Sequence, residues 1–450
     1  MTRLTRREML ALLAGAAATA PAMAGAAPRG VIAVVGAGLA GLVAARHLTR
    51  AGAQVVVLEG RERIGGPISP TRLGPGPPPD LGGRGIHGST GNPLTALAVE
   101  AGATRFATSY EAALTLDATG NAIDPDTFLP PVERLVAAAR RRAEGLDHDV
   151  SLAGAITATA QWRAATATLR RRVRYHINAT VEQEYGGDWS EVSAWNFDES
   201  AEFSGPDTFF PQGFGQITAM LARGLDVRLG ARVEDIAREA EELRLTLAGG
   251  DSLKAAAAIV TVPLGVLQKG ALRFAAPLSD AKRRAIAGLR MGLLNKCWLR
   301  FERVAWPDDV DWIEWLGPKD GVWAEWLSLA HTARAPVLLG FNAGAQAREM
   351  ETLDDRAMAA SAHAALKAMF GESFPAPVAA QVTRWAQDPF SFGSYSFNAV
   401  GTGPRTRQAL AAPEWDGRLL FAGEATAPRH FGTAHGAVMS GVAAASALMR

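Results

Sequence analysis

The chain has 450 residues and a formal net charge of +1, with 48% hydrophobic and 20% charged residues. This length suggests two or three domains of about 150 residues, and the composition is typical of a globular protein with a large core. The small net charge argues against a nucleic-acid partner, because binding to phosphates requires a basic face. The single cysteine, Cys297, excludes an intramolecular disulfide and a cysteine-based metal cluster. The eight histidines lack H-x-x-x-H spacing, so we expect no metal.

Residues 1–29 are similar to the signal peptide of an exported precursor. Arg6 and Arg7 precede an apolar, alanine-rich stretch over 9–20, and small residues follow around Ala24. The stretch is shorter than the roughly 20 apolar residues that span a bilayer. We therefore expect a twin-arginine signal and a periplasmic or secreted protein without stable membrane insertion. The alternative is an unprocessed N-terminus and a cytoplasmic protein.

Residues 31–59 predict a nucleotide-binding unit of strand, helix and strand. An apolar run over 31–35 predicts a buried strand, 39–50 a helix, and 54–58 a second strand. The intervening glycines follow G-x-G-x-x-G spacing, which permits a tight turn, lets a pyrophosphate approach, and lets the helix pack closely. Glu59 follows the second strand, and its carboxylate is in the position that binds a ribose in such units. The expected nucleotide contacts in this unit are Gly36, Gly38, Leu39, Ala40, Gly41 and Glu59.

The elements that follow change character along the chain. We expect a Pro/Gly-rich loop over 70–79, a helix opening near 93, and helices over 130–175, 216–224 and 354–370. Strands are predicted near 227–229, 233–247, 258–262, 294–301, 312–326 and 419–422, and a closing helix over 432–448. Segments typical of nucleotide-binding folds therefore lie at both ends, which favours two interleaved domains.

Several short motifs, in this order, resemble those of the flavin-containing amine oxidases. They are 34–41 with Glu59, 63–66, 80–83, 86–88, 262–267, Lys296, 393–396, 421–424 and 436–437. The resemblance covers about 31–448. Residues 86–93 and 393–396 are most similar to the branch that contains polyamine oxidases and histone-lysine demethylases.

The resemblance implies an α/β fold in which a Rossmann-type FAD-binding domain is interleaved with an α+β substrate-binding domain. The expected FAD-binding segments are 30–95, 205–285 and 391–450, and the substrate-binding segments are 96–204 and 286–390. Monoamine oxidases carry a flavin-linking cysteine where this chain has Ser394, so the resemblance implies non-covalent FAD. An oligomer is possible.

The resemblance also implies the residues of the site. Further cofactor contacts are expected from Gly60, Arg61, Arg63, Gly65, Gly66, Gly83, Arg84, Val233, Gly423, Glu424, Thr433 and Ala434. The implied catalytic residues are Lys296, which would hold a water against flavin N5, Tyr395 and Thr433 as walls of an aromatic cage, and His87 near the substrate amine.

Each of these side chains also has a simpler interpretation. Lys296 lies in an apolar strand, where burying its ammonium costs free energy unless the group is hydrogen-bonded or ion-paired. A lysine at the edge of a strand can instead extend its ammonium into solvent. Tyr395 could guide a cation with its ring or be an ordinary core tyrosine. His87 lies in a glycine-flanked loop, where its side chain could transfer protons or could simply be exposed to solvent.

The implied reaction is the oxidation of an amine by hydride transfer to flavin N5, with O2 as acceptor. The products would be an aldehyde, a smaller amine or ammonia, and hydrogen peroxide. Candidate acids for distal ammonium groups of a polyamine are Glu182, Glu184, Glu199 and Glu202. The alternatives are an L-amino-acid oxidase, for which Arg290 is a candidate carboxylate clamp, and a flavin desaturase.

Two positions depart from the family pattern. Pro67 replaces a usual arginine, which would weaken flavin contacts unless Arg84 substitutes for it. Gly85 replaces a frequent tryptophan, which would open the roof of the pocket to a bulkier substrate. These departures leave open a flavin-binding protein without turnover.

Overall fold

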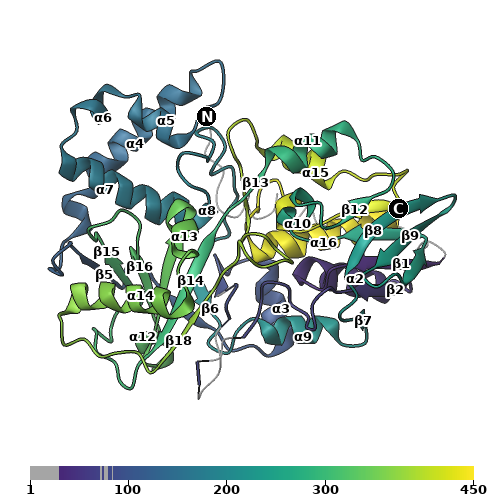
Figure 1. Cartoon of the computed structure of the whole chain (residues 1–450), viewed down its shortest axis with the longest axis horizontal. Helices are drawn as coiled ribbons and strands as arrows, with labels where there is room; N and C mark the ends of the chain where they lie inside the picture. The colour runs from purple at the N-terminus through teal and green to yellow at the C-terminus, as the bar shows by residue number, and fades with distance from the viewer. Residues whose placement is uncertain (1–29, 71–72, 75–79, 84) are drawn as a thin grey trace, which may run out of the picture.

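The computed structural model of the protein describes residues 30–450 except 71–72, 75–79 and 84. The expected signal peptide and Arg84 lie outside the described residues. The described chain forms two lobes that lie side by side along the long axis of the molecule (Figure 1). Both the first and the last segments of the chain, purple and yellow, lie in the same lobe (Figure 1).

That lobe is built on a parallel sheet with the strand order β20-β11-β1-β2-β7. Its strands are β1 (Val31–Val35), β2 (Gln54–Leu58), β7 (Asp226–Arg228), β11 (Ala257–Val260) and β20 (Leu419–Phe421). Both faces are buried, because Ile32 and Val34 pack into one core while Ala33 and Val35 pack into another. The unbroken apolar runs in the sequence are explained by this double burial.

Helices cover one face of this sheet and a second sheet covers the other. The helices are α2 (Leu39–Arg50), α3 (Pro93–Ala101), α9 (Gly215–Ala222) and α16 (Ala434–Leu448). The second sheet has the order β10-β9-β8-β12, with β8 (Val233–Glu239), β9 (Glu242–Leu247), β10 (Ser252–Ala255) and β12 (Arg273–Phe274). Three further helices complete the lobe: α10 (Leu264–Gln268), α11 (Asp280–Gly288) and α15 (Pro404–Ala411).

The other lobe contains a six-stranded sheet with the order β18-β14-β17-β16-β15-β5. The strands are β5 (Ala113–Leu116), β14 (Leu294–Arg300), β15 (Trp312–Trp315), β16 (Glu325–Ser328), β17 (Val337–Ala343) and β18 (Ala379–Val382). All neighbours are antiparallel except β5 and β15, which are parallel. The helix α14 (Asp355–Phe370) packs Met358, Ala362 and Leu366 into the core on one face.

Short helices complete this lobe. They are α4 (Leu129–Glu144), α5 (Leu152–Thr157), α6 (Ala160–Ala164), α7 (Ala167–Ile177), α8 (Gln183–Tyr185), α12 (Ala330–Ala333) and α13 (Gly344–Met350), with the turns η1 (Pro125–Thr127) and η2 (Asn178–Glu182). Within the described residues, no helix is both long and apolar enough to cross a membrane.

Two small sheets lie between elements that are far apart in sequence. One has the order β3-β6-β4, with β3 (Gly85–Ile86), β4 (Phe106–Thr108) and β6 (Asp207–Phe209). The other pairs β13 (Arg290–Met291) with β19 (Ser396–Phe397). The turn η3 (Glu424–Thr426) follows β20. The first sheet places residues from the middle of the chain next to its beginning, and the second places them next to Ser396 and Phe397 near its end.

Candidate active site

The three glycines at and after the turn between β1 and α2, of which Gly41 lies inside α2, have different surroundings. Gly36 has a φ of +108°, which favours glycine. A Cβ on Gly41 would overlap the Gly36 carbonyl oxygen and come to 2.9 Å from Thr261 Oγ1, so this glycine permits close packing of helix on strand. A Cβ on Gly38 would meet nothing within 4 Å. Gly38 therefore faces the open space that an approaching pyrophosphate needs.

The carboxylate of Glu59 joins two loops at the end of the sheet. Glu59 is 6% exposed, and its two oxygens accept hydrogen bonds from the backbone N–H groups of Ala37 (2.7 Å) and Arg61 (2.8 Å). Its backbone oxygen accepts from Ala231 N–H (2.8 Å), close to the start of β8 at Val233. Glu59, which is predicted to bind the ribose, and Val233, which is predicted to contact the adenine, therefore lie close together at this end of the sheet.

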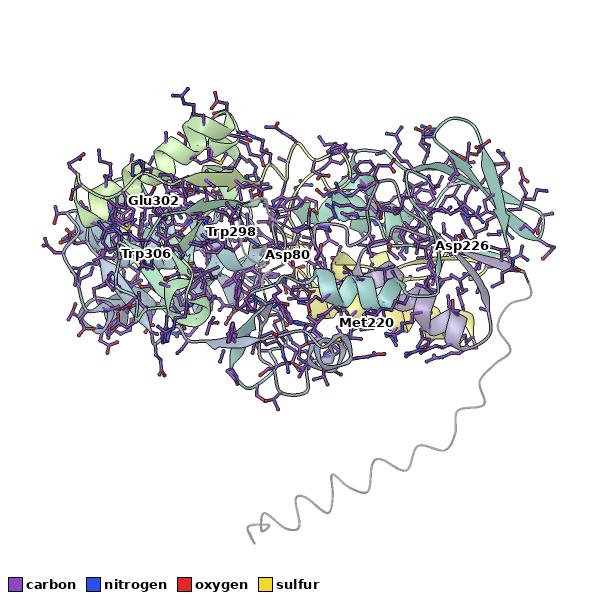
Figure 2. All side chains as sticks on the ribbon, turned by 90° about the horizontal axis from the view of Figure 1, so that it is seen from below. Asp80, Met220, Asp226, Trp298, Glu302 and Trp306 are labelled. Carbon is purple, nitrogen blue, oxygen red and sulfur yellow. The ribbon has the colours of Figure 1, made fainter. Side chains whose placement is uncertain are left out.

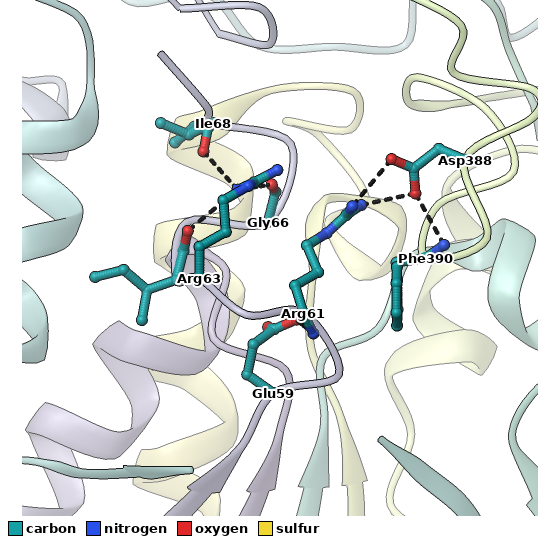
Figure 3. Close-up of polar contacts among 8 residues, drawn as sticks. Glu59, Arg61, Arg63, Gly66, Ile68, Asp388 and Phe390 are labelled. Carbon is teal, nitrogen blue, oxygen red and sulfur yellow. Dashed lines mark hydrogen bonds and ion pairs between the residues drawn. The ribbon is translucent and has the colours of Figure 1, made fainter. Parts of the chain in front are cut away.

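The loop over 60–66 contains two arginines with different surroundings (Figure 3). The Arg61 guanidinium donates to both carboxylate oxygens of Asp388, at 3.0 and 2.8 Å, and lies 4.8 Å from the Phe390 ring centroid. A Cβ on Gly60 would come to 2.6 Å from the same ring. Arg61, expected to contact the cofactor, is thus paired with the loop that follows β18.

Arg63 stabilises the turn that contains Gly65 and Gly66. Its Nη1 atom donates to the carbonyl oxygens of Ile64 (3.2 Å), Gly66 (2.7 Å) and Ile68 (3.0 Å) (Figure 3). Burial lowers the pKa of the Arg63 guanidinium, and the nearby charge of Arg61 adds to this effect. Both glycines have positive φ, and a Cβ on Gly66 would lie 3.4 Å from the Cα of Gly38. The turn therefore lies directly against the first glycine loop.

Lys296 is connected to this turn through the loop over 80–83. The ammonium Nζ donates a hydrogen bond to the Gly82 carbonyl oxygen, and Lys296 is 6% exposed. A Cβ on Gly82 would overlap the Pro67 carbonyl oxygen, so Pro67 packs against this loop. A Cβ on the next residue, Gly83, would lie 3.4 Å from the Phe214 ring. A hydrogen-bonded, buried ammonium therefore lies beside the glycine loops.

Asp80 anchors the same loop and lies between the two lobes (Figure 2). Its carboxylate accepts a hydrogen bond from the backbone N–H of Phe214, which precedes α9. Burial raises the pKa of the Asp80 carboxyl to about 6, although the Phe214 hydrogen bond and the charge of Lys296 partly oppose this shift. Asp80 was not among the predicted site residues.

Tyr395 lies between two glycines from different parts of the chain. Its hydroxyl donates to the Gln183 carbonyl oxygen (2.6 Å). A Cβ on Gly186 would be 3.1 Å from the ring, and a Cβ on Gly432 would be 3.3 Å away. A side chain at either position would therefore crowd the ring. The preceding Ser394 accepts from Leu294 N–H (2.9 Å) and donates to the Gly292 carbonyl (3.2 Å).

The segment between β20 and α16 is held by Glu424 and Thr433. Glu424 accepts from Ser396 N–H (2.9 Å), Ser396 Oγ (2.7 Å) and Gly432 N–H (2.7 Å), and Gly423 before it has a φ of +131°. Thr433 Oγ1 caps α16 by accepting from Gly436 N–H (2.9 Å). Ala434 is the first residue of that helix. Glu424 thereby joins the Tyr395 loop to the beginning of α16; direct contacts of Glu424, Thr433 and Ala434 with a cofactor stay predictions.

His87 lies in the turn after β3, and its Nδ1 atom is 3.0 Å from Asp207 Oδ2 on β6. Two further histidines, His430 and His435, lie near the same turn: Asn92 Nδ2 is 3.1 Å from the His87 carbonyl and 3.5 Å from His435 Nδ1. Burial, with the neighbouring His430 and His87, lowers the pKa of His435 to about 4. Asp207 and His435 were not predicted, because no local sequence pattern marks either one.

The expectation that Gly85 opens the pocket is wrong. A Cβ on Gly85 would overlap the carbonyl oxygen of Thr208 and lie 2.9 Å from its carbonyl carbon. The backbone of β6, paired with β3, therefore fills the space of the missing side chain. A surface pocket does lie beside this pairing, and it is lined by Gly85, Ile86, His87, Thr108, Asp207, Thr208, Phe209, Trp312 and Leu327.

The candidate substrate acids fall into two groups. Glu182 is fully buried and hydrogen-bonded to Arg174 (3.2 Å) and Asn178 (2.8 Å), so its carboxylate is already paired within the protein. Glu184, Glu199 and Glu202 are exposed. Arg290, the candidate clamp for a carboxylate, is exposed and donates to the Ala287 carbonyl oxygen (2.8 Å).

Residues 39–449 match the family model of flavin-containing amine oxidoreductases, and the chain belongs to this family. Among its relatives, polyamine oxidase 4 of Oryza sativa subsp. japonica is 33% identical and covers 93% of this chain and 88% of its own. Polyamine oxidase 2 of Arabidopsis thaliana is 32% identical, covering 92% and 86%. The lysine-specific histone demethylase 1 homolog 3 of Oryza sativa subsp. indica is 33% identical, but this chain spans only 52% of its length.

Solved structures confirm the fold class. A double mutant of putrescine oxidase superposes with a TM-score of 0.75 at 20% sequence identity, covering 93% of this chain and 98% of that one. A triple mutant of putrescine oxidase superposes with a TM-score of 0.74. The predicted two-part α/β architecture and the predicted family are therefore both confirmed.

The described residues fit a dinucleotide flavin. Gly38 presents open space to a pyrophosphate, and the α2 N-terminus has no side-chain cap that would compete for its first N–H groups. The adjacent Gly66 turn and the Glu59 carboxylate lie at the same end of the sheet. This is the carboxyl end of the parallel strands, where such folds bind nucleotides.

Proposed function

We propose that the protein is an FAD-dependent amine oxidase that uses dioxygen as electron acceptor and holds its flavin non-covalently. The proposed reaction converts an amine, O2 and water into an aldehyde, a smaller amine or ammonia, and hydrogen peroxide. The observation that carries this proposal is the buried Lys296 ammonium, hydrogen-bonded to a loop that packs against the glycine turn. The relatives named polyamine oxidases support an amine substrate.

In this proposal the glycine loops and Glu59 hold the cofactor, and Glu424 and Thr433 shape the loop beside it. Bound flavin would supply the two-electron oxidation of the substrate carbon. Lys296 would hold a water molecule and stabilise negative charge near the reacting centre. The Tyr395 ring, fixed by its bond to Gln183, would orient the amine.

His87 would accept the proton from the substrate ammonium at a ring nitrogen, because only a neutral amine has a lone pair that assists removal of a hydride. The ring is partly exposed, so a small substrate can reach it. The Ser394 hydroxyl makes two hydrogen bonds within the protein, and a serine cannot form the thioether through which a cysteine holds flavin. This supports non-covalent binding.

The experiment is a peroxide assay on the purified holoenzyme with spermine, spermidine, N-acetylated polyamines, phenethylamine and L-amino acids. We expect peroxide with at least one amine, and bleaching of the flavin by that amine without oxygen. Bleaching without peroxide would refute dioxygen as the acceptor. Turnover of amino acids alone would favour the amino-acid oxidase, and no bleaching with any of them would favour a binding protein without turnover.

We also propose that the protein is exported through the twin-arginine route, which carries folded proteins and would allow the cofactor to bind beforehand. The paired arginines at 6 and 7 support this proposal. Replacing both with lysine should leave the full-length precursor in the cytoplasmic fraction. Unchanged periplasmic or secreted protein would refute it.

A further inference from the structure

The turn that carries His87 is anchored at several points. Asp207 Oδ1 accepts from the Gly88 N–H (2.9 Å), and Asp207 Oδ2 lies 3.0 Å from His87 Nδ1. Asn92 Nδ2 donates to the His87 carbonyl oxygen (3.1 Å). Gly88 has a φ of +62°, and a Cβ there would overlap the Phe203 carbonyl oxygen. The backbone of the turn is therefore fixed, and one carboxylate contacts two consecutive residues.

The carboxylate determines which ring nitrogen carries the proton. An ionised carboxylate only accepts hydrogen bonds, so His87 Nδ1 must be the protonated nitrogen when it faces Asp207. In the neutral ring, Nε2 is then left with a free lone pair. We infer that Asp207 is a positioning residue that holds His87 in the Nδ1–H tautomer, so that Nε2 can take a proton from a substrate ammonium.

The location of the pair fits this role. Both side chains line the surface pocket beside β3 and β6, together with Thr108 of β4, Trp312 of β15 and other residues of β3, β6 and β16. The His87 side chain is 45% exposed and that of Asp207 is 29% exposed, so a small cation can approach both. His430 and His435 lie near the same turn, but burial lowers the pKa values of both. His87 instead lies 3.0 Å from a carboxylate oxygen of Asp207.

This inference rests on the proposed function. In the proton transfer an N–H bond of the substrate ammonium breaks and an Nε2–H bond forms on His87, so the amine becomes neutral. The carboxylate of Asp207 remains ionised and receives no proton. The role of Asp207 is therefore to orient the ring and to stabilise its charge.

The test uses Asp207→Asn in the full-length holoenzyme. The asparagine retains an oxygen that can accept from Gly88 N–H, so the anchor of the turn is preserved, but it removes the anionic acceptor for Nδ1. Ring-nitrogen NMR of ¹⁵N-histidine-labelled protein at alkaline pH reports which nitrogen is protonated. The chain has eight histidines, and a spectrum of His87→Gln identifies the His87 signals by their loss.

We expect a protonated Nδ1 and an unprotonated Nε2 in the wild type, and a shift of the tautomer population toward Nε2–H in Asp207→Asn. A wild-type Nε2–H tautomer would overturn the inference, whether or not an amine is oxidised. Absence of amine turnover in the wild type would overturn the proposed function instead. The NMR result thus separates the two failures.

Steady-state kinetics provide a second test of the role of Asp207. Asp207→Asn should lower kcat/KM for the amine by about tenfold or more. Because Asp207 acts through His87, the double variant with His87→Gln should be no slower than His87→Gln alone. Asp226→Asn is the matched control, since Asp226 is a half-exposed acid on β7 paired with Arg228. Additive losses in the double variant, or unchanged kcat/KM in Asp207→Asn, would overturn the positioning role.

Discussion

Two glycine-to-alanine substitutions at the start of α2 should have opposite consequences. A methyl group at Gly38 meets nothing of the protein within 4 Å, whereas at Gly41 it would overlap the Gly36 carbonyl oxygen. Gly38→Ala should therefore leave the fold intact and interfere with the cofactor. Gly41→Ala should strain the fold itself, because a backbone atom cannot move aside as a flexible side chain can.

The magnitudes follow from these contacts. At Gly38, the N-cap of α2, alanine is a poorer cap than glycine by about 1 kcal/mol at most. At Gly41, inside α2, alanine gains about 1 kcal/mol of helix propensity, but overpacking costs roughly 1–3 kcal/mol. The added methyl group would collide with the backbone and also lie 2.9 Å from Thr261 Oγ1, so we expect an overpacking cost at the upper end of this range. The free energy of unfolding should then fall by about 2 kcal/mol in total.

The assay combines thermal unfolding of apoprotein, followed by circular dichroism, with titration of FAD, followed by quenching of flavin fluorescence. Gly38→Ala should unfold near the wild-type temperature but bind FAD at least about tenfold more weakly, which corresponds to about 1.4 kcal/mol. Gly41→Ala should unfold at a clearly lower temperature. Wild-type FAD affinity in Gly38→Ala would refute the approach of a pyrophosphate at this glycine, and wild-type stability of Gly41→Ala would refute the packing argument.

Three further predictions concern charged residues. Arg61→Ala and Asp388→Asn should each weaken FAD binding, and their effects should not add in a double-mutant cycle, because each acts through the other; additive effects would contradict this. Because burial raises the folded pKa of Asp80 to about 6, well above its unfolded value, its protonated form contributes stability below about pH 4 that is lost as the pH rises to about 6. Urea unfolding should show Asp80→Asn gaining roughly 3 kcal/mol relative to wild type across that window, and a constant difference would contradict the shift. Lys296→Met should slow flavin reduction or reoxidation by about tenfold or more in stopped-flow measurements, and unchanged rates for both would show that the ammonium has no role there.

The sequence alone determined the elements that depend on local pattern. The bounds of β1, α2 and β2 agree with the prediction because an apolar run, a glycine turn and an amphipathic helix are specified by neighbouring residues. The closing helix and the buried position of Lys296 were predicted for the same reason. The strand β17 was not predicted, because Gly340 and Asn342 interrupt its apolar run.

Only the tertiary structure decided which distant groups meet. Arg61 pairs with Asp388, 327 residues away, and His87 pairs with Asp207, 120 residues away. No local pattern encodes such partners, because each depends on how segments that are far apart in sequence pack together. The same reason explains the error at Gly85, where the backbone of a strand from another part of the chain occupies the space that the sequence suggested was open.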